Sequence, residues 1–127
     1  MNEDQRLKLL RLTLLVTGVV TLAVYPLMLL WPSGWVWHSG YSPYPMMIVG
    51  IYATLGVFLI RAARDPLANL SLIWFTVWSS VVHGSIMAVQ ALANPEHRGH
   101  LLGDVPELLM AAVLLAALTP RGRGSPS

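Results

Sequence analysis

The sequence predicts an all-α integral membrane protein, a four-helix bundle with both termini in the cytoplasm. Three observations predict it. Of the 127 residues, 55% are hydrophobic and 11% are charged, whereas globular chains carry about 25% charged residues. The apolar residues fall into four runs that we interpret as transmembrane spans. With these spans crossing a membrane, seven of the eight Lys and Arg residues lie on one side, as expected for cytoplasmic loops.

The basic residues set the predicted orientation. Only Arg98 falls on the outer side; the cytoplasmic set is Arg6, Lys8, Arg11, Arg61, Arg64, Arg121 and Arg123. Because this set is divided among three short segments, it does not form the patch of a nucleic-acid binder, and we expect the lipid bilayer as its partner. The chain has no cysteine, which excludes disulfides, thiolate metal sites and thiol redox chemistry.

The first helix is predicted over residues 5–31. Its apolar run of about 20 residues spans ~30 Å, which is too long for a cleaved signal peptide. Pro26 removes one backbone donor and predicts a kink. Residues 32–44 carry several Trp and Tyr side chains and no Lys or Arg, so we expect a loop lying along the outer membrane interface. Its aromatic residues are Trp35, Trp37, Tyr41 and Tyr44.

The second helix is predicted over residues 45–60, with Pro45 in its first turn. The third is predicted over residues 69–92, where Asn69 is a good N-cap residue and Asn94-Pro95 ends the helix. These assignments leave a cytoplasmic turn at residues 61–68. They also leave a short outer loop after the third helix.

The fourth helix is predicted over residues 101–119. Asp104 and Glu107 have the D-x-x-E spacing of a capping box, and Pro106 suits the first turn. The four helices form one domain, residues 1–120, and residues 121–127 are predicted to be a disordered cytoplasmic tail.

Four polar side chains lie at similar predicted depths in the outer half of the bundle, within about one helical turn of each other. They are Tyr25, Tyr52, His83 and Glu107. Polar groups inside a membrane usually face the bundle interior and find partners there. We therefore expect one buried polar centre, and a ligand-binding site is one hypothesis for its role. In the alternative interpretation, a Tyr or Glu satisfies His83, and the group only holds the helices in register.

A metal site at the outer mouth is a weaker hypothesis. Its ligands would be His97, His100 and Asp104, with Glu107 at the next position of the same spacing. These residue types suit zinc, iron or manganese. However, Gly99 and Gly103 argue against a continuous helix, and a capping role competes for the two carboxylates. Haem is disfavoured, because His83 is the only histidine well within a span.

Catalytic motifs are not evident, so the sequence favours a non-enzyme over an enzyme. Ser79 and Ser80 lie beside His83 only because residues three and four apart are neighbours on a helix. The sequence shows no oxyanion-hole element, P-loop or dinucleotide-binding glycine pattern. No catalytic residue is assigned.

From Ile48 onward the chain resembles small bacterial four-helix membrane proteins of the DoxX-like kind. The resemblance lies in the small-residue segment 50–56, the turn at 61–65, a polar centre on the third helix and Pro106-Glu107-Leu108-Leu109. It is most similar to a family known as a domain of unknown function, in which residues 78–84 would be distinctive. The resemblance implies a bundle in the bacterial inner membrane, with quinone-coupled or other redox chemistry in some members.

These observations predict a non-catalytic or accessory protein of the bacterial inner membrane, whose polar centre holds the packing or binds a small apolar-bodied ligand. The alternative is a redox-associated subunit that binds a quinone-like molecule near His83. Metal binding is the third hypothesis. The cofactor stays open, with a quinone as the candidate, and so does assembly into a homo-oligomer or a larger membrane complex.

Overall fold

The structure is a computed structural model that describes residues 2–36 and 43–120, and every regular element in these ranges is helical, which confirms the all-α prediction. The elements in chain order are α1 (Glu3–Leu22), α2 (Val24–Leu30), α3 (Pro32–Trp35), α4 (Pro43–Ala62), the 3₁₀-helix η1 (Pro66–Asn69), α5 (Leu70–Ala93), the 3₁₀-helix η2 (Pro95–Leu102) and α6 (Asp104–Leu118).

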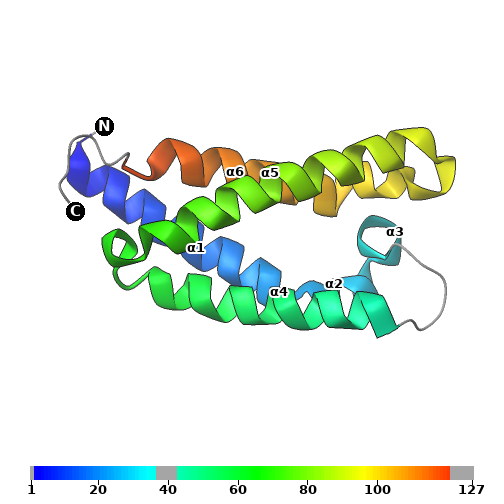
Figure 1. Cartoon of the computed structure of the whole chain (residues 1–127), viewed down its shortest axis with the longest axis horizontal. Helices are drawn as coiled ribbons and strands as arrows, with labels where there is room; N and C mark the ends of the chain where they lie inside the picture. Colours follow the sequence, from blue (N-terminus) through cyan, green and yellow to red (C-terminus); the bar gives the residue numbers. More distant parts are fainter. Residues whose placement is uncertain (1, 37–42, 121–127) are drawn as a thin grey trace.

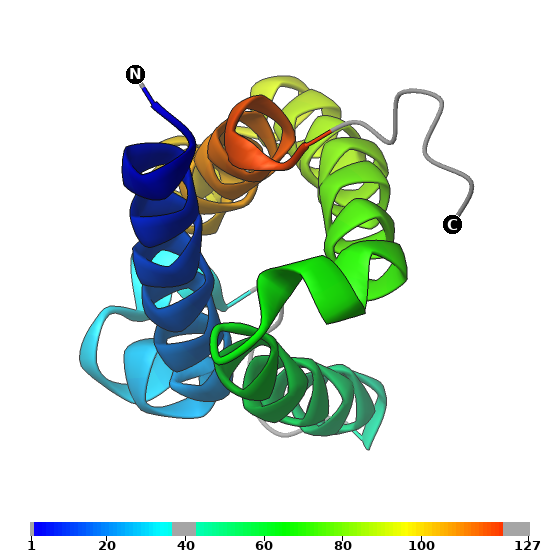
Figure 2. The same ribbon diagram turned by 90° about the vertical axis from the view of Figure 1, so that its left-hand side faces the viewer.

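The long helices lie side by side, and α1 begins at the same end of the molecule at which α6 ends (Figure 1). Viewed from that end, α1, α6, α5 and α4 follow one another around a common axis (Figure 2). Extensive packing joins α1 to α4, α5 to α6 and α1 to α6. The neighbours α4 and α5 pack least, although η1 connects them.

The hydrophobic core occupies the half of the molecule nearest to the start of α1. Its fully buried side chains come from all four long helices: Leu10, Leu14, Leu59, Ile73 and Leu115 are 0% exposed. Arg6 closes this end, because its guanidinium donates hydrogen bonds to the carbonyl oxygens of Leu118 at 2.9 Å and Thr119 at 3.2 Å. The carbonyls of a helix C-terminus have no partner within their own helix, so Arg6 satisfies the end of α6.

Glycine allows α1 and α4 to approach closely. A Cβ on Gly56 would lie 2.6 Å from the Gly18 carbonyl oxygen, and a Cβ on Gly18 would lie 2.9 Å from the Gly56 oxygen. Gly50, on the same helix as Gly56, has nothing within 4 Å of such a Cβ. Close backbone approach of this kind supplies dispersion contacts where lipid offers no hydrophobic drive to association.

By length and composition, one helical segment could cross a membrane by itself, namely Pro66–Ala93. Two bent pairs also pass when each is taken as one span: α1 with α2, bent by 59°, and η2 with α6, bent by 41°. Met46–Ala62 of α4 is apolar but shorter. The described residues therefore contain one helix long and apolar enough to cross a membrane, or up to three such segments if each bent pair is one span, and the fourth predicted span stays a prediction.

The first predicted helix, residues 5–31, is two helices with a break at Ala23. Proline clashes with the carbonyl four residues before it, which for Pro26 is that of Leu22, the last residue of α1. The break therefore lies one turn before the predicted kink. The fourth predicted helix, residues 101–119, also differs, because residues 95–102 form η2 and α6 begins at Asp104.

The prediction of a loop along the membrane interface is wrong for residues 32–35. Residues 32–35 form α3, which turns inward against η2, and Trp35 is only 9% exposed. Gly99 and Gly103 permit this contact, since a Cβ on either would lie 2.4 Å from the carbonyl oxygen of Ser33 or Gly34. Trp37, Tyr41, the Tyr44 side chain and the predicted tail at residues 121–127 lie outside the described residues.

Candidate ligand-binding cavity

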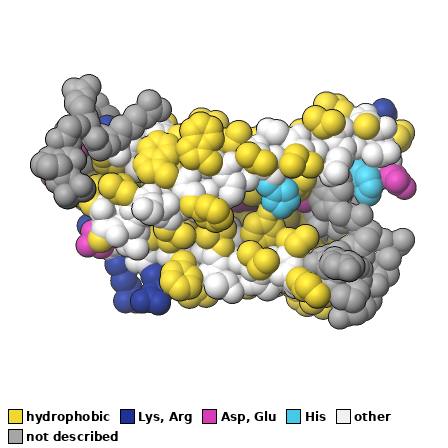
Figure 3. All heavy atoms as spheres, viewed as in Figure 1, with side chains coloured by type: hydrophobic (Ala, Val, Ile, Leu, Met, Phe, Trp, Pro, Cys, Tyr) yellow, Lys and Arg dark blue, Asp and Glu magenta, His cyan; other side chains and the backbone are white. Residues whose placement is uncertain are grey.

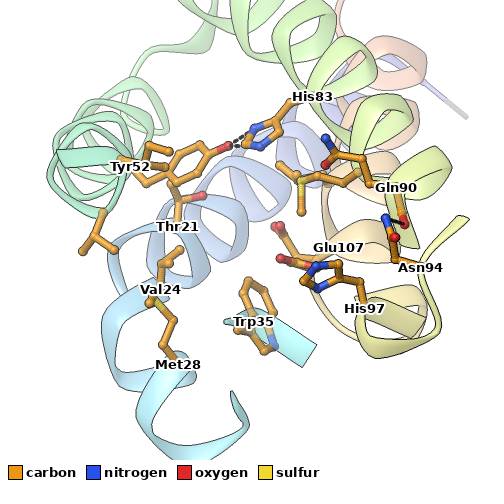
Figure 4. Close-up of a pocket in the computed structure, with 15 residues that line it drawn as sticks. Thr21, Val24, Met28, Trp35, Tyr52, His83, Gln90, Asn94, His97 and Glu107 are labelled. Carbon is orange, nitrogen blue, oxygen red and sulfur yellow. Dashed lines mark hydrogen bonds between the residues drawn. The ribbon is translucent and has the colours of Figure 1, made fainter. Parts of the chain in front are cut away.

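A cavity of about 450 Å³ lies in the half of the molecule opposite the hydrophobic core. This volume falls within the range of small-molecule sites, roughly 300–1,000 Å³. We call it the outer cavity (Figure 4). Its lining comes from all six α-helices and from η2. It consists of Thr21, Val24, Met28, Trp35, Ile48, Val49, Tyr52, His83, Met87, Gln90, Asn94, His97, Asp104, Glu107 and Leu108.

Tyr52 and His83 form a hydrogen bond across the cavity wall, between the Tyr52 hydroxyl and His83 Nδ1. Their rings are nearly parallel, with an interplanar angle of 7° and centroids 5.6 Å apart. A phenol and an imidazole nitrogen can each donate or accept, so the donor depends on the tautomer. The bond links α4 to α5, the pair of neighbouring helices that packs least. We call it the Tyr52–His83 bridge.

Glu107 points toward the same space from the first turn of α6 (Figure 4). Within the described part of the chain, its carboxylate makes no hydrogen bond or ion pair. The predicted capping box is therefore wrong: the N-cap is Gly103, and no side chain caps the helix. Asp104 is the first residue of α6, one position after the N-cap, and its carboxylate pairs with His100 instead. Glu107 is thus left facing the cavity.

Asp104 forms a buried pair with His100 beside the cavity. The His100 Nδ1 atom lies 2.9 Å from Asp104 Oδ1, and its Nε2 atom lies 2.8 Å from the carbonyl oxygen of Val36. His100 is 1% exposed and Asp104 is 6% exposed. The pair therefore ties η2 and α6 to the end of α3.

The described ranges contain no assembled metal site. No group of three or more His, Asp or Glu side chains there is arranged to hold a metal ion. His97 and His100 have ring centroids 5.9 Å apart, and His97 Nε2 lies 3.7 Å from Glu96 Oε1. A metal site formed by His97, His100 and Asp104 stays a prediction.

Tyr25 does not join the other three residues of the predicted polar centre. It lies on α2, is 44% exposed and does not line the cavity. The 59° bend before α2 explains this, because the depth of a residue predicts its position only along a straight helix. Thr21, the last polar residue of α1, lies at the cavity instead.

Helical spacing predicts some of the other lining residues but not all of them. Met87 and Gln90 follow His83 at four and seven residues, so helical spacing placed them on its face. Trp35 carried no such signal, because its position depends on the inward turn of α3. The apolar side of the cavity, with Val24 and Met28, depends on the bend at Ala23.

A smaller cavity of about 290 Å³, which we call the inner cavity, adjoins the outer one. The two share Thr21, Ile48, Tyr52, His83, Glu107 and Leu108. The Tyr52–His83 bridge therefore lies where the two cavities meet. The remaining inner lining comes from residues nearer to the hydrophobic core, among them Thr17, Leu55, Thr76 and Ala111.

The chain belongs to a family of unknown function, DUF6632, whose model matches residues 5–125. The predicted membership of such a family is thereby confirmed. The chain is also similar to ferric-chelate reductase 1 of Bos taurus, with 34% identity over 84 residues, which are 65% of this chain and 14% of the reductase. No solved structure matches the chain. The likeness to DoxX-like proteins and the bacterial source stay predictions.

Proposed function

We propose that this protein is an integral membrane protein that binds one small, apolar-bodied molecule with a hydrogen-bonding head group in the outer cavity. The observation that carries the proposal is a cavity of small-molecule size that is lined by both polar and apolar side chains. Tyr52, His83 and Glu107 lie there, while Val24, Met28 and Ile48 supply an apolar side. Known ligand sites combine a mostly apolar lining with a few placed polar groups in this way.

The lining also indicates the chemistry of the head group. None of the residues that line the outer cavity is Lys or Arg, so a phosphate or carboxylate head would lack a counter-charge. A neutral head group with two oxygen atoms fits better. The Tyr52 hydroxyl and the Gln90 amide can donate to it, and the Glu107 carboxylate can accept from it. Quinols have this pattern, because their two hydroxyl groups can each donate and accept a hydrogen bond.

We further propose four crossings with both termini cytoplasmic, in a bacterial inner membrane, in keeping with the resemblance to DoxX-like proteins. Exposed apolar side chains on α4, α5 and α6 support a lipid-facing surface: Ile51, Phe75, Trp78 and Val113 are 63–68% exposed. The 20 residues of α4 would cover ~30 Å at 1.5 Å per residue. Arg6 joins the start of α1 to the end of α6, which is consistent with an even number of crossings.

A redox-associated role is the second candidate, and one observation favours it. The similarity to ferric-chelate reductase 1 covers 65% of this chain. A protein that holds a quinol beside a reductase would act as an accessory subunit without catalysing the reaction itself. The chain spans 14% of that relative, so the reductase activity is not carried over with the similarity.

Isothermal titration calorimetry on the protein in lipid nanodiscs tests the proposal. The probe is 2,3-dimethoxy-5-methyl-1,4-benzoquinol, a head group without a tail. Tyr52→Phe removes one hydroxyl at the cavity, and Tyr25→Phe removes one from an exposed position outside it. We expect saturable binding that weakens several-fold in Tyr52→Phe, as the loss of a hydrogen bond worth ~1 kcal/mol implies. Binding unchanged in Tyr25→Phe is the matching control.

No binding to the wild-type protein would contradict the proposal. Equal losses in the two tyrosine variants would also contradict it, because the effect would then not come from the cavity.

A further inference from the structure

Apart from Tyr52, His83 and Glu107, which it shares with the outer cavity, the inner cavity is mostly apolar despite the number of Thr and Ser residues around it. The hydroxyl of Thr21 donates to the Thr17 carbonyl at 2.6 Å, that of Thr76 to Leu72 at 2.8 Å, and that of Ser79 to Thr76 at 3.3 Å. These hydroxyls are turned toward their own helices, so they present little polarity to the space. Leu55, Phe75 and Ala111 complete an apolar lining.

The inner cavity opens sideways between α4 and α5. Ile51 on α4 and Phe75 on α5 both line it, yet they are 68% and 63% exposed. Side chains that are both lining and exposed mark the mouth of a cavity. Ile48 lines both cavities and is 48% exposed, so the outer cavity reaches the same face. Figure 3 shows a histidine between these two helices, with apolar side chains along both.

This opening faces the apolar side of the molecule. In the proposed membrane orientation, exposed Ile, Phe and Val side chains along α4 and α5 contact the hydrocarbon of the bilayer. Helices α4 and α5 are also the neighbours that pack least. A molecule dissolved in the bilayer would therefore meet the two cavities without passing through water.

We infer that the ligand carries one hydrocarbon chain, and that this chain lies in the inner cavity while the head group lies in the outer cavity. The inference rests on the proposed function. The cavities meet at the Tyr52–His83 bridge, which would contact the ligand where head and chain join. The ligand class is then a neutral, hydrogen-bonding head on a single chain, such as a prenylated quinol, which reaches its site from the bilayer between α4 and α5.

A phospholipid acyl chain has the same chemistry as the chain of such a ligand, so the test must separate the two sources. One probe is a quinol with a diazirine at the end of a hydrocarbon tail. The other is a phosphatidylethanolamine with a diazirine at the end of one acyl chain. Each is incorporated into nanodiscs with the full-length protein, photolysed, and the labelled residues are mapped by mass spectrometry.

We expect the tailed quinol to label Thr76 and Ala111, which line the inner cavity and are 2% and 6% exposed. An excess of the tail-less quinol should reduce this labelling to background, because the head group would be displaced. The labelled phosphatidylethanolamine should react instead with exposed residues such as Val82 and Val113, which line neither cavity.

Labelling of Thr76 and Ala111 by the phospholipid would show that the inner cavity holds a lipid chain and would overturn the inference. Labelling by the tailed quinol only at exposed residues would also overturn it. Calorimetry with the tail-less quinol keeps the outcomes separate. If the tail-less quinol binds but the tailed quinol does not label the inner cavity, the inference fails and the proposed function stands. If the tail-less quinol does not bind, the proposed function itself fails.

Discussion

The imidazole of His100 lies between the Asp104 carboxylate and the Val36 carbonyl, at 2.9 Å and 2.8 Å. A carbonyl oxygen can only accept a hydrogen bond, so Nε2 of His100 carries a hydrogen. Nδ1 and Asp104 Oδ1 must then share one proton, whichever of the two atoms holds it. The pair is neutral overall in both cases, which explains how an acid and a base are both buried here.

This arrangement predicts how substitutions in the pair rank. Asp104→Asn keeps a hydrogen bond, since an amide N–H can donate to Nδ1 of a neutral imidazole, and we expect a small loss of stability. Asp104→Leu leaves Nδ1 without its Asp104 partner, at a cost of about 1–3 kcal/mol. His100→Leu removes the base from a buried carboxylate and should cost most, about 3–5 kcal/mol. Thermal unfolding in detergent checks the order; an equal effect of all three would contradict the shared proton.

Arg6 should contribute to stability through the end of α6 and not merely through its charge. Its guanidinium donates to carbonyl oxygens of Ala117, Leu118 and Thr119. Hydrogen bonds from charged groups are worth about 1.5–3 kcal/mol, so Arg6→Ala should lower the free energy of unfolding by about that much. Lys8→Ala removes an exposed charge from the same helix and should change it little. Equal losses would indicate a general charge effect.

Two glycines of α4 should respond in opposite ways to the same substitution. Gly56→Ala places a Cβ 2.6 Å from the Gly18 oxygen and should destabilise the α1–α4 contact by about 1–3 kcal/mol. Gly50→Ala meets open space, so it should be neutral or stabilise by up to ~1 kcal/mol through helix propensity. Unfolding of the two variants in one detergent measures both. A stable Gly56→Ala protein would contradict the close approach.

The proposed topology predicts which positions share a compartment. The chain has no native cysteine, so single cysteines report one site each. Asp4→Cys and Asp65→Cys lie at the end where α1 begins, and Glu96→Cys lies at the other end; all three positions are exposed. A membrane-impermeant maleimide added to intact cells should label only Glu96→Cys. If Asp4→Cys and Asp65→Cys lie on opposite sides of the membrane, the two crossings proposed between these positions are contradicted.

The helix α5 was predictable because its boundaries depend on local sequence. The helix from Leu70 to Ala93 matches the predicted residues 69–92 closely, since Asn69 and Asn94-Pro95 bound one apolar run. Asn69 does occupy the N-cap position, but its side chain donates to the Asp65 carbonyl instead of capping.

The rest of the site depends on contacts distant in sequence. The D-x-x-E spacing predicted a cap, but His100 binds Asp104, and Val36 fixes His100 in turn. The inward turn of α3 depends on glycine backbones at 99 and 103 that face Ser33 and Gly34. The prediction for Tyr25 assumed a straight first helix. Because the chain bends at Ala23, Tyr25 lies at the surface instead. Tyr52, His83 and Glu107 lie within α4, α5 and α6, and the structure brings them to one cavity.

The most direct test of a ligand at the Tyr52–His83 bridge is nuclear magnetic resonance of the imidazole nitrogens. The chain has four histidines, so ¹⁵N-histidine labelling in nanodiscs gives few signals, and His83→Gln assigns the relevant one. As the tail-less quinol is titrated, the His83 signals should shift saturably, while those of His100, held by Asp104 and Val36, should stay in place. His83 signals that do not move at concentrations where calorimetry detects binding would contradict a ligand at this site.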